Sequence, residues 1–443
     1  MGYSFQKTYT LLPQSPLIHF QHDQSGATLR ATEVKPKLDR YIIRRWRREH
    51  GGADIPGSWK IPNTPEGKTA LKYQLRITAA EPIKQVRLDY YEEKLSDGTT
   101  VKHREYDIYY GNMGSGAKKQ GIIAECNLTV TCVLTELLNY MDDVLFDFFI
   151  VTNFGTMQNK GFGSFRVKVE GKPIRISDMC EILKREYGVE HIYYFKADKE
   201  FRERSSRKNK YTGRRENTEI VKGVFNQIKI VYSLIKSGVN LSSMPQYRRL
   251  PAGDDRIPYR RSMLFTYMHD NGIGNEKAWM KQNRISPVIG EHKYRPNAPD
   301  SVARYVRALL GVGEAIEYKN SSDNPRDKVT VKIAETGKEI ERLSSPIMFK
   351  IIGAGEHPFV LFFGRKIDEA IYGKTFEFSS ALGSDKLTVP SKEELPVNFM
   401  DSFMHYVYLE LKKCQKKFAE IAIRYELGDD KKQHPVGCVF KEV

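Results

Sequence analysis

The chain has 443 residues, a length that predicts two domains rather than one, and its 40% hydrophobic residues are enough to form their cores. Lys and Arg number 71 against 55 Asp and Glu, and the formal net charge of +16 predicts attraction to a polyanion, either nucleic acid or an anionic membrane surface. No run approaches the roughly 20 apolar residues of a membrane span, and the start of the chain lacks the pattern of a signal peptide. Five cysteines without a CxxC pair argue against a zinc site or a disulfide framework. We therefore expect a soluble cytoplasmic protein with no metal ion and no cofactor.

The first half of the chain alternates between the periodicities of strands and helices. Strand-like runs lie at 9–20, 71–78, 84–91, 122–133 and 162–169. Helical spacing marks 27–48, where we place Pro36 in the first turn, and 134–149. The order matches the β-α-β-β-α-β unit of ferredoxin-like domains.

After about residue 185 a similar alternation starts again. Strand-like runs lie at 190–197, 314–319, 328–334, 346–352 and 358–364, and helical runs at 218–237, 300–310 and 398–424. We predict an α+β protein made of two ferredoxin-like modules with inserted loops and helices. The first module would comprise residues 1–184, and the second, more decorated one would comprise residues 185–443.

A glycine-rich segment, NFGTMQNKGFGSFR at 153–166, separates the second predicted helix from the strand that follows. Glycines let a backbone approach a ligand closely or adopt positive φ. Nearby cations can pair with phosphates, and the phenylalanines can stack or pack. The candidate residues are Lys160, Gly161, Phe162, Gly163, Ser164 and Arg166. An ordinary glycine turn between helix and strand explains the segment equally well.

The first predicted helix is strongly basic and follows a glycine turn at Gly26. Free N–H groups and the helix dipole make such a helix start favourable for phosphate. The candidate cations are Arg30, Lys35, Lys37, Arg40, Arg44, Arg45 and Arg47. The alternative is a solvated charged face, which is weaker than usual here because only Glu33 and Asp39 lie among these cations.

A third basic segment, YRRLPAGDDRIPYRRS at 247–262, combines arginines with two tyrosines. Guanidinium groups can bind phosphates in a forked geometry, and tyrosines can stack on bases. The candidate residues are Arg248, Arg249, Arg256, Arg260 and Arg261. Alternatively, these arginines pair with Asp254 and Asp255 in a simple loop.

Histidines are the main candidates for catalysis. His19 and His22 flank a loop and could deprotonate a 2′-hydroxyl, as in a metal-independent ribonuclease. No second acid or base accompanies them. Paired acids such as Asp142-Asp143 are better explained as surface or helix-cap residues, so we predict no catalytic centre.

Several motifs in order resemble the RAMP superfamily of CRISPR-associated proteins. A Ser15-Pro16-Leu17 step leads into the basic helix GATLRATEVKPKLDRYIIRRW, and the glycine loop NKGFGSFRV follows the second helix. The second half carries Arg260-Arg261-Ser262, then RPNAPDSVARYVRALLG and RLSSPIMFKI. The sequence is most similar to the capping RAMP subunit of the type III-B (Cmr) effector complex. It differs from the common pattern in having Asn159-Lys160 where two arginines are usual.

The resemblance implies a non-catalytic subunit of a type III CRISPR ribonucleoprotein in antiviral defence. Such a subunit would contact the 3′ region of the guide RNA and the target RNA, and would pack on a backbone RAMP subunit. Two alternatives remain: a CRISPR-repeat endoribonuclease of the same fold that uses His19 or His22, and a structural adaptor whose basic loops bind protein partners.

Overall fold

A computed structural model gives the fold. It describes residues 5–18, 28–62, 64, 69–80, 83–86, 90–94, 100–104, 121–169, 175–196, 218–240, 259–283, 296–313, 316–319, 328–334, 343–353, 358–413, 424–427, 433–436 and 440–443. The chain forms two compact units. Unit 1 comprises Met1–Gly188, Ser205–Phe225 and Phe349–Leu361, and unit 2 comprises Val189–Arg204, Asn226–Met348 and Phe362–Val443. The sequence-based boundary at 184 falls inside helix α4 (Ile176–Tyr187).

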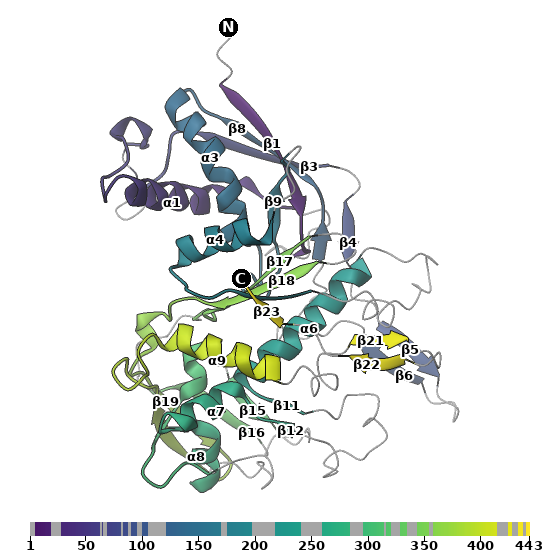
Figure 1. The fold of residues 1–443 in the computed structure, drawn as a ribbon, viewed down its shortest axis with the longest axis vertical. Coiled ribbons are helices and arrows are strands. Elements are labelled where there is room, and N and C mark those ends of the chain that lie inside the picture. Colours follow the sequence, from purple (N-terminus) through teal and green to yellow (C-terminus); the bar gives the residue numbers. More distant parts are fainter. Residues whose placement is uncertain are drawn as a thin grey trace. The chain divides into compact units, whose positions relative to one another are not determined.

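A four-stranded antiparallel sheet forms the centre of unit 1 (Figure 1). Its strands are β1 (Gln6–Pro13), β3 (Gln74–Ala79), β8 (Cys126–Thr131) and β9 (Phe165–Val167), in the order β3-β8-β1-β9. Helix α1 (Ala31–Glu49) follows β1, and α3 (Thr135–Val151) follows β8. The chain therefore runs strand, helix, strand, strand, helix, strand through these elements, in the order that the sequence predicts.

The helices cover one face of this sheet. α1 contacts β3 and α3, α3 contacts β9, and α4 packs on α3. Along β8 the buried residues Cys126, Leu128 and Val130 alternate with partly exposed ones, as expected for a strand with one covered face. Apolar residues of α1 recur at helical spacing, and Val34, Leu38 and Ile42 are fully buried.

Pro36 lies in a different place from the one expected. Because α1 begins at Ala31, Pro36 occupies its second turn, not the first. Proline has no N–H, so the carbonyl of Thr32 loses the donor that a helix normally supplies four residues later.

Unit 1 also contains short strands outside this sheet. β2 (Leu17–Ile18), β7 (Gly121–Ile123) and β4 (Lys84–Val86) form a small antiparallel sheet, and β5 (Tyr90–Lys94) pairs with β6 (Thr100–Arg104). The predicted run 122–133 is thus two strands, because β7 and β8 join different sheets. The predicted run 9–20 is likewise divided between β1 and β2.

Unit 2 contains an antiparallel sheet of order β15-β16-β19-β20. These strands are β15 (Ile316–Lys319), β16 (Lys328–Ile333), β19 (Thr375–Ser380) and β20 (Gly383–Thr388). β10 (Tyr193–Lys196) and β23 (Phe440–Glu442) are antiparallel neighbours at one edge of a further sheet. Two-stranded sheets are antiparallel β11 (Val239–Asn240) with β12 (Tyr259–Arg260), antiparallel β21 (Arg424–Leu427) with β22 (Gln433–Val436), and parallel β13 (Ile273–Asn275) with β14 (Val302–Arg304). Its helices include α7 (Met263–Asp270), α8 (Glu276–Gln282) and α9 (Phe399–Lys413).

Three elements contain a boundary between the units along the chain. They are α6 (Thr218–Lys236), β17 (Ile347–Ile352) and β18 (Phe359–Gly364). The predicted helix at 300–310 is instead β14 followed by the 3-10 helix η4 (Val306–Leu310). The protein is therefore a mixed α/β chain with several antiparallel sheets. Within the part of the chain that the structure describes, no helix is both long and apolar enough to cross a bilayer.

Candidate nucleic-acid interface

Most cations of α1 pair with carboxylates. The pairs are Lys35–Asp39 (2.9 Å), Lys37–Glu33 (3.0 Å), Arg44–Glu186, Arg45–Glu49 (2.7 Å) and Arg47–Asp54 (3.0 Å). The sequence reasoning counted only Glu33 and Asp39 as neighbours and missed the carboxylates that other elements supply. The helix is therefore less cationic at its surface than its composition indicates.

These paired cations differ in how far water reaches them. The Arg45 side chain is 14% exposed and also pairs with Asp147 at 2.9 Å, while Arg185 binds the same carboxylate oxygen at 2.6 Å. Burial raises the pKa of Asp147, and the two arginines oppose that shift. In contrast, the Arg44 and Arg47 side chains are 59% and 55% exposed. Arg45 thus holds α1 in place, whereas Arg44 and Arg47 can still reach a ligand.

A cavity of about 940 Å³ opens beside the first half of α1. Its lining is mainly apolar and includes Pro36, Ile61 and Leu75, together with the cations Lys35 and Arg40. The Arg40 side chain is exposed, and among the described residues it has no hydrogen bond or ion pair. This cavity combines an apolar wall with a cation that is available for a phosphate.

Lys35 lines the same cavity and is partly buried. Its Nζ donates to the Asp39 carboxylate and, at 3.0 Å, to the main-chain carbonyl of Leu71, and it lies 4.2 Å from the centre of the Tyr73 ring. Burial, and then the Asp39 charge, raises the pKa of the Tyr73 hydroxyl well above its ordinary value. Lys35 therefore shapes the cavity wall while Arg40 remains open to solvent.

The glycine loop needs its glycines for close backbone contacts. Gly155 (φ +74°) and Gly163 (φ +65°) both have left-handed φ. A Cβ added at Gly155 would lie 2.4 Å from the Ile18 carbonyl oxygen, and one at Gly163 would lie 1.9 Å from the Phe154 carbonyl oxygen. The close approach that the sequence predicts is therefore present, but the partner at these two glycines is the protein's own backbone.

Hydrogen bonds join this loop to the Ser15-Pro16-Leu17 step and to α1. The N–H of Gly163 donates to the Pro16 carbonyl (2.8 Å), and the N–H of Ser164 donates to the Ser15 hydroxyl (2.9 Å). The Glu33 carboxylate accepts from the N–H of Gly155 (2.7 Å). Three motifs that the sequence singled out thus meet in one place. Since these three N–H groups already have acceptors within the protein, they form a structural joint and are not open to a phosphate.

Other candidate residues of the loop are buried or contact other parts of the protein. Residues 161–164 are buried. Phe162 packs face to face on Phe225, with ring centres 3.8 Å apart. Lys160 forms an isolated bridge with Phe349. Arg166 lies on β9 and is partly exposed, as is Arg30 at the N-cap of α1.

A buried lysine that the sequence reasoning missed completes the joint. Lys350 of β17 donates to the main-chain carbonyl of Phe149 (2.9 Å) and to the side-chain oxygen of Asn153 (2.9 Å) at the C-terminal end of α3. A cation is favourable there because the helix dipole is negative at that end. Nearby, the Ser164 hydroxyl donates to the Ile351 carbonyl (2.9 Å). A lone lysine in an apolar strand gives no local signal of this role.

The arginine segment of the second half belongs to a different unit. Arg260 lies on β12 opposite Val239, and both Arg260 and Arg261 are partly exposed in unit 2. Arg248, Arg249 and Arg256 lie outside the described residues, as do Gly26, His19 and His22. The structure therefore brings together only the first-half candidates.

Comparison with protein families places the chain. The sequence matches two family models, the Cmr1 N-terminal domain over residues 5–239 and the Cmr1 C-terminal domain over residues 259–429. Together they span nearly the whole sequence, and the chain belongs to the Cmr1 family. It is thus a RAMP-type CRISPR protein of the type III-B effector complex, which confirms the resemblance inferred from the motifs. Comparison with curated protein sequences gives no match.

Proposed function

We propose that this chain is the non-catalytic RNA-binding subunit of a type III-B CRISPR ribonucleoprotein, and that unit 1 contacts the 3′ region of the guide RNA and the target RNA. Other subunits of the effector complex, including a backbone RAMP protein, would be its protein partners. Family membership supports the assembly, and the net charge of +16 supports a polyanionic ligand.

The cavity beside α1 is the observation that carries the RNA proposal. Arg40 is exposed and has no partner among the residues that the structure describes, which suits a phosphate, and the adjoining apolar wall suits the face of a base. RNA-guided complexes read sequence through base pairing, so a subunit of this kind needs only backbone and shape contacts. Arg44 and Arg47, further along the same helix, would extend the contact along the RNA backbone.

The fold supports the same proposal. In our interpretation, unit 1 is a ferredoxin-like module, because its six main elements and the strand order β3-β8-β1-β9 match that topology. We extend this interpretation to the core of the second half, with its inserted loops and helices. The function of such a fold lies in its surface, which here is the cavity side of α1.

Binding to a labelled single-stranded RNA, measured by fluorescence anisotropy at low salt, tests the proposal. Arg40→Glu should weaken binding roughly tenfold or more, because it replaces a phosphate contact with a repulsive charge. Lys392→Glu is the matched control, since Lys392 is an exposed cation of unit 2 paired with Glu369. Equal affinities for all three proteins would remove the cavity from the interface, and no binding by the unaltered protein would favour the adaptor alternative.

The non-catalytic part of the proposal needs its own assay. The protein is incubated with CRISPR-repeat RNA in EDTA, and the products are separated on a gel. We expect intact RNA. Site-specific cleavage that disappears in His22→Ala would instead establish the endoribonuclease.

A further inference from the structure

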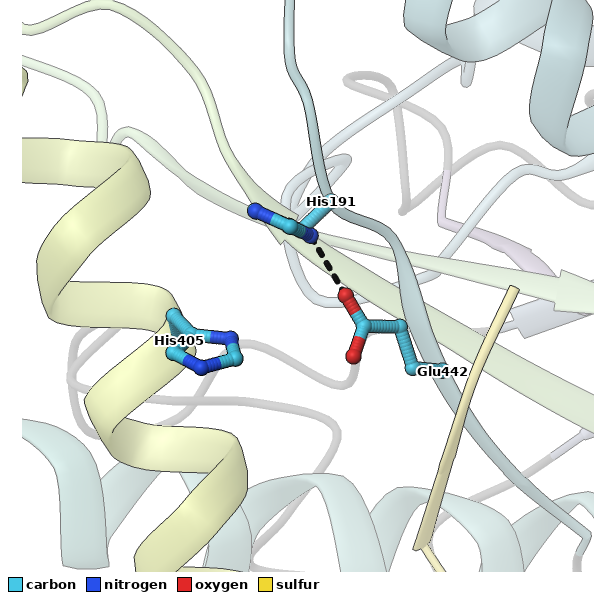
Figure 2. Close-up of side chains that lie close together, drawn as sticks. All are labelled: His191, His405 and Glu442. Atoms are coloured by element: carbon cyan, nitrogen blue, oxygen red, sulfur yellow. Dashed lines mark hydrogen bonds and ion pairs between the residues drawn. The ribbon is translucent and has the colours of Figure 1, made fainter.

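We propose that unit 2 binds a divalent transition-metal ion, of the zinc type, through His191, His405 and Glu442. The three side chains come from separate elements: His191 precedes β10, His405 lies on α9, and Glu442 lies on β23. Figure 2 shows them pointing toward a common space. One potential ligand atom from each residue lies within 4.8 Å of those of the other two.

The spacing is close to what a metal ion requires. Zinc lies about 2.0–2.2 Å from imidazole nitrogen and carboxylate oxygen, so ligand atoms on one tetrahedral ion are roughly 3.4 Å apart. Small side-chain rotations close the remaining difference, because His191 and His405 are only partly buried and Glu442 is exposed. Two imidazoles and a carboxylate suit zinc and its first-row neighbours, and they leave a coordination position for water.

His405 makes the cluster more than an ordinary ion pair. His191 Nδ1 already contacts the Glu442 carboxylate, a pair that needs no third group. Yet the His405 ring lies 5.3 Å from the His191 ring, centre to centre. The Tyr193 hydroxyl lies 3.3 Å from His405 Nδ1, which orients the ring and leaves Nε2 for a ligand. Such supporting bonds to the second imidazole nitrogen are typical of metal-binding histidines.

Tyr193, which contacts His405, is itself held in place by packing. Tyr193 is fully buried and stacks on Tyr408 of α9, with ring centres 4.7 Å apart. On the neighbouring strand, Glu442 lies directly opposite Tyr193 in the β10–β23 register. The positions of His405 and Glu442 are thus both fixed relative to one buried tyrosine.

The surrounding charge favours a cation. Asp401 lies one turn before His405 on α9, and Glu190 lies next to His191. The two acids are close enough to interact, because burial raises the pKa of the Asp401 carboxyl and the negative charge of Glu190 raises it further.

Isothermal titration of Zn²⁺ into the full chain, without a histidine tag and freed of metal with EDTA, tests the proposal. We expect one strong site per chain. His405→Gln and Glu442→Gln should each weaken Zn²⁺ binding roughly tenfold or more, because each removes one of three ligands while keeping side-chain volume. The control His269→Ala removes a partly buried histidine of unit 2 that contacts the carboxylate of Asp270, and this variant should bind Zn²⁺ like the unaltered protein.

Co²⁺ provides an independent readout. Its visible absorption reports the ligand geometry, and the spectrum should change in both glutamine variants but not in His269→Ala. Far-UV circular dichroism of the metal-free variants checks that each one folds. Wild-type Zn²⁺ affinity in either folded glutamine variant, or no strong Zn²⁺ binding by the unaltered chain, would overturn the proposal.

Discussion

The Nζ of Lys350 donates a hydrogen bond of 2.9 Å to the main-chain carbonyl of Phe149, a residue 201 positions earlier in the chain. This contact places a fully buried amine at the end of α3, beside the glycine loop. The amine binds neutral oxygens, and no carboxylate of the described residues pairs with it. Lys350 therefore joins the segment at 349–353 to the strand-helix framework of unit 1.

Lys350 should make stability depend on pH. Burial lowers its pKa from 10.5 to about 7, so between these values the unfolded chain binds more protons than the folded one. The free energy of unfolding should then rise with pH, by about 2 kcal/mol from pH 7 to pH 9. Urea unfolding of the unaltered protein and of Lys350→Met at both pH values isolates this effect. A difference between the two proteins that stays constant with pH would contradict it.

The glycine loop should tolerate no side chain at Gly163. Gly163→Ala would place a Cβ against the Phe154 carbonyl, and we expect a loss of several kcal/mol or failure to fold. Gly188→Ala is the matched control, because Gly188 has a similar φ of +62° but no atom within 4 Å of an added Cβ. Its cost should be only about 1–2 kcal/mol, the strain of left-handed backbone. Equal thermal midpoints for the two variants would show that the close contact does not matter.

Arg45 should contribute to the stability of the fold, whereas Arg47 should contribute little. Arg45→Met breaks the pair with the mostly buried Asp147 and should lower the free energy of unfolding by about 1–3 kcal/mol. Arg47→Met removes an exposed pair with Asp54 and should change stability little. Chemical denaturation measures the free energy of unfolding of both variants. A smaller decrease for Arg45→Met than for Arg47→Met would contradict the prediction. Charge reversals that probe RNA binding by α1 should accordingly use Arg44 and Arg47 and leave Arg45 in place.

The sequence predicted the element order of unit 1 because periodicity and turn residues act locally. It could not predict which carboxylates meet α1, since Glu186 and Asp147 are distant in sequence and come from α4 and α3. It identified the backbone approach at the glycine loop, but a glycine pattern does not say whether the approaching group is a ligand or the chain itself. His191, His405 and Glu442 share no sequence spacing, so their meeting depends entirely on the fold.

The sequence-based prediction does not include α4, although the pattern of this helix is local. Its twelve residues, Ile176–Tyr187, carry a charged face and end at Gly188, a regular helix stop. RNA binding by Arg248, Arg249 and Arg256 stays a prediction, because these three residues lie outside the part of the chain that the structure describes.

The salt dependence of RNA binding tests the central claim most directly. Affinity for single-stranded RNA is measured over a range of salt concentrations for the unaltered protein, Arg40→Ala and the control Lys392→Ala. If Arg40 binds a phosphate, Arg40→Ala should bind more weakly, and the slope of log affinity against log salt should decrease in magnitude by about 0.7, the value for one contact. Lys392→Ala should match the unaltered protein. An affinity and slope for Arg40→Ala that equal those of the control would contradict RNA binding at the cavity beside α1.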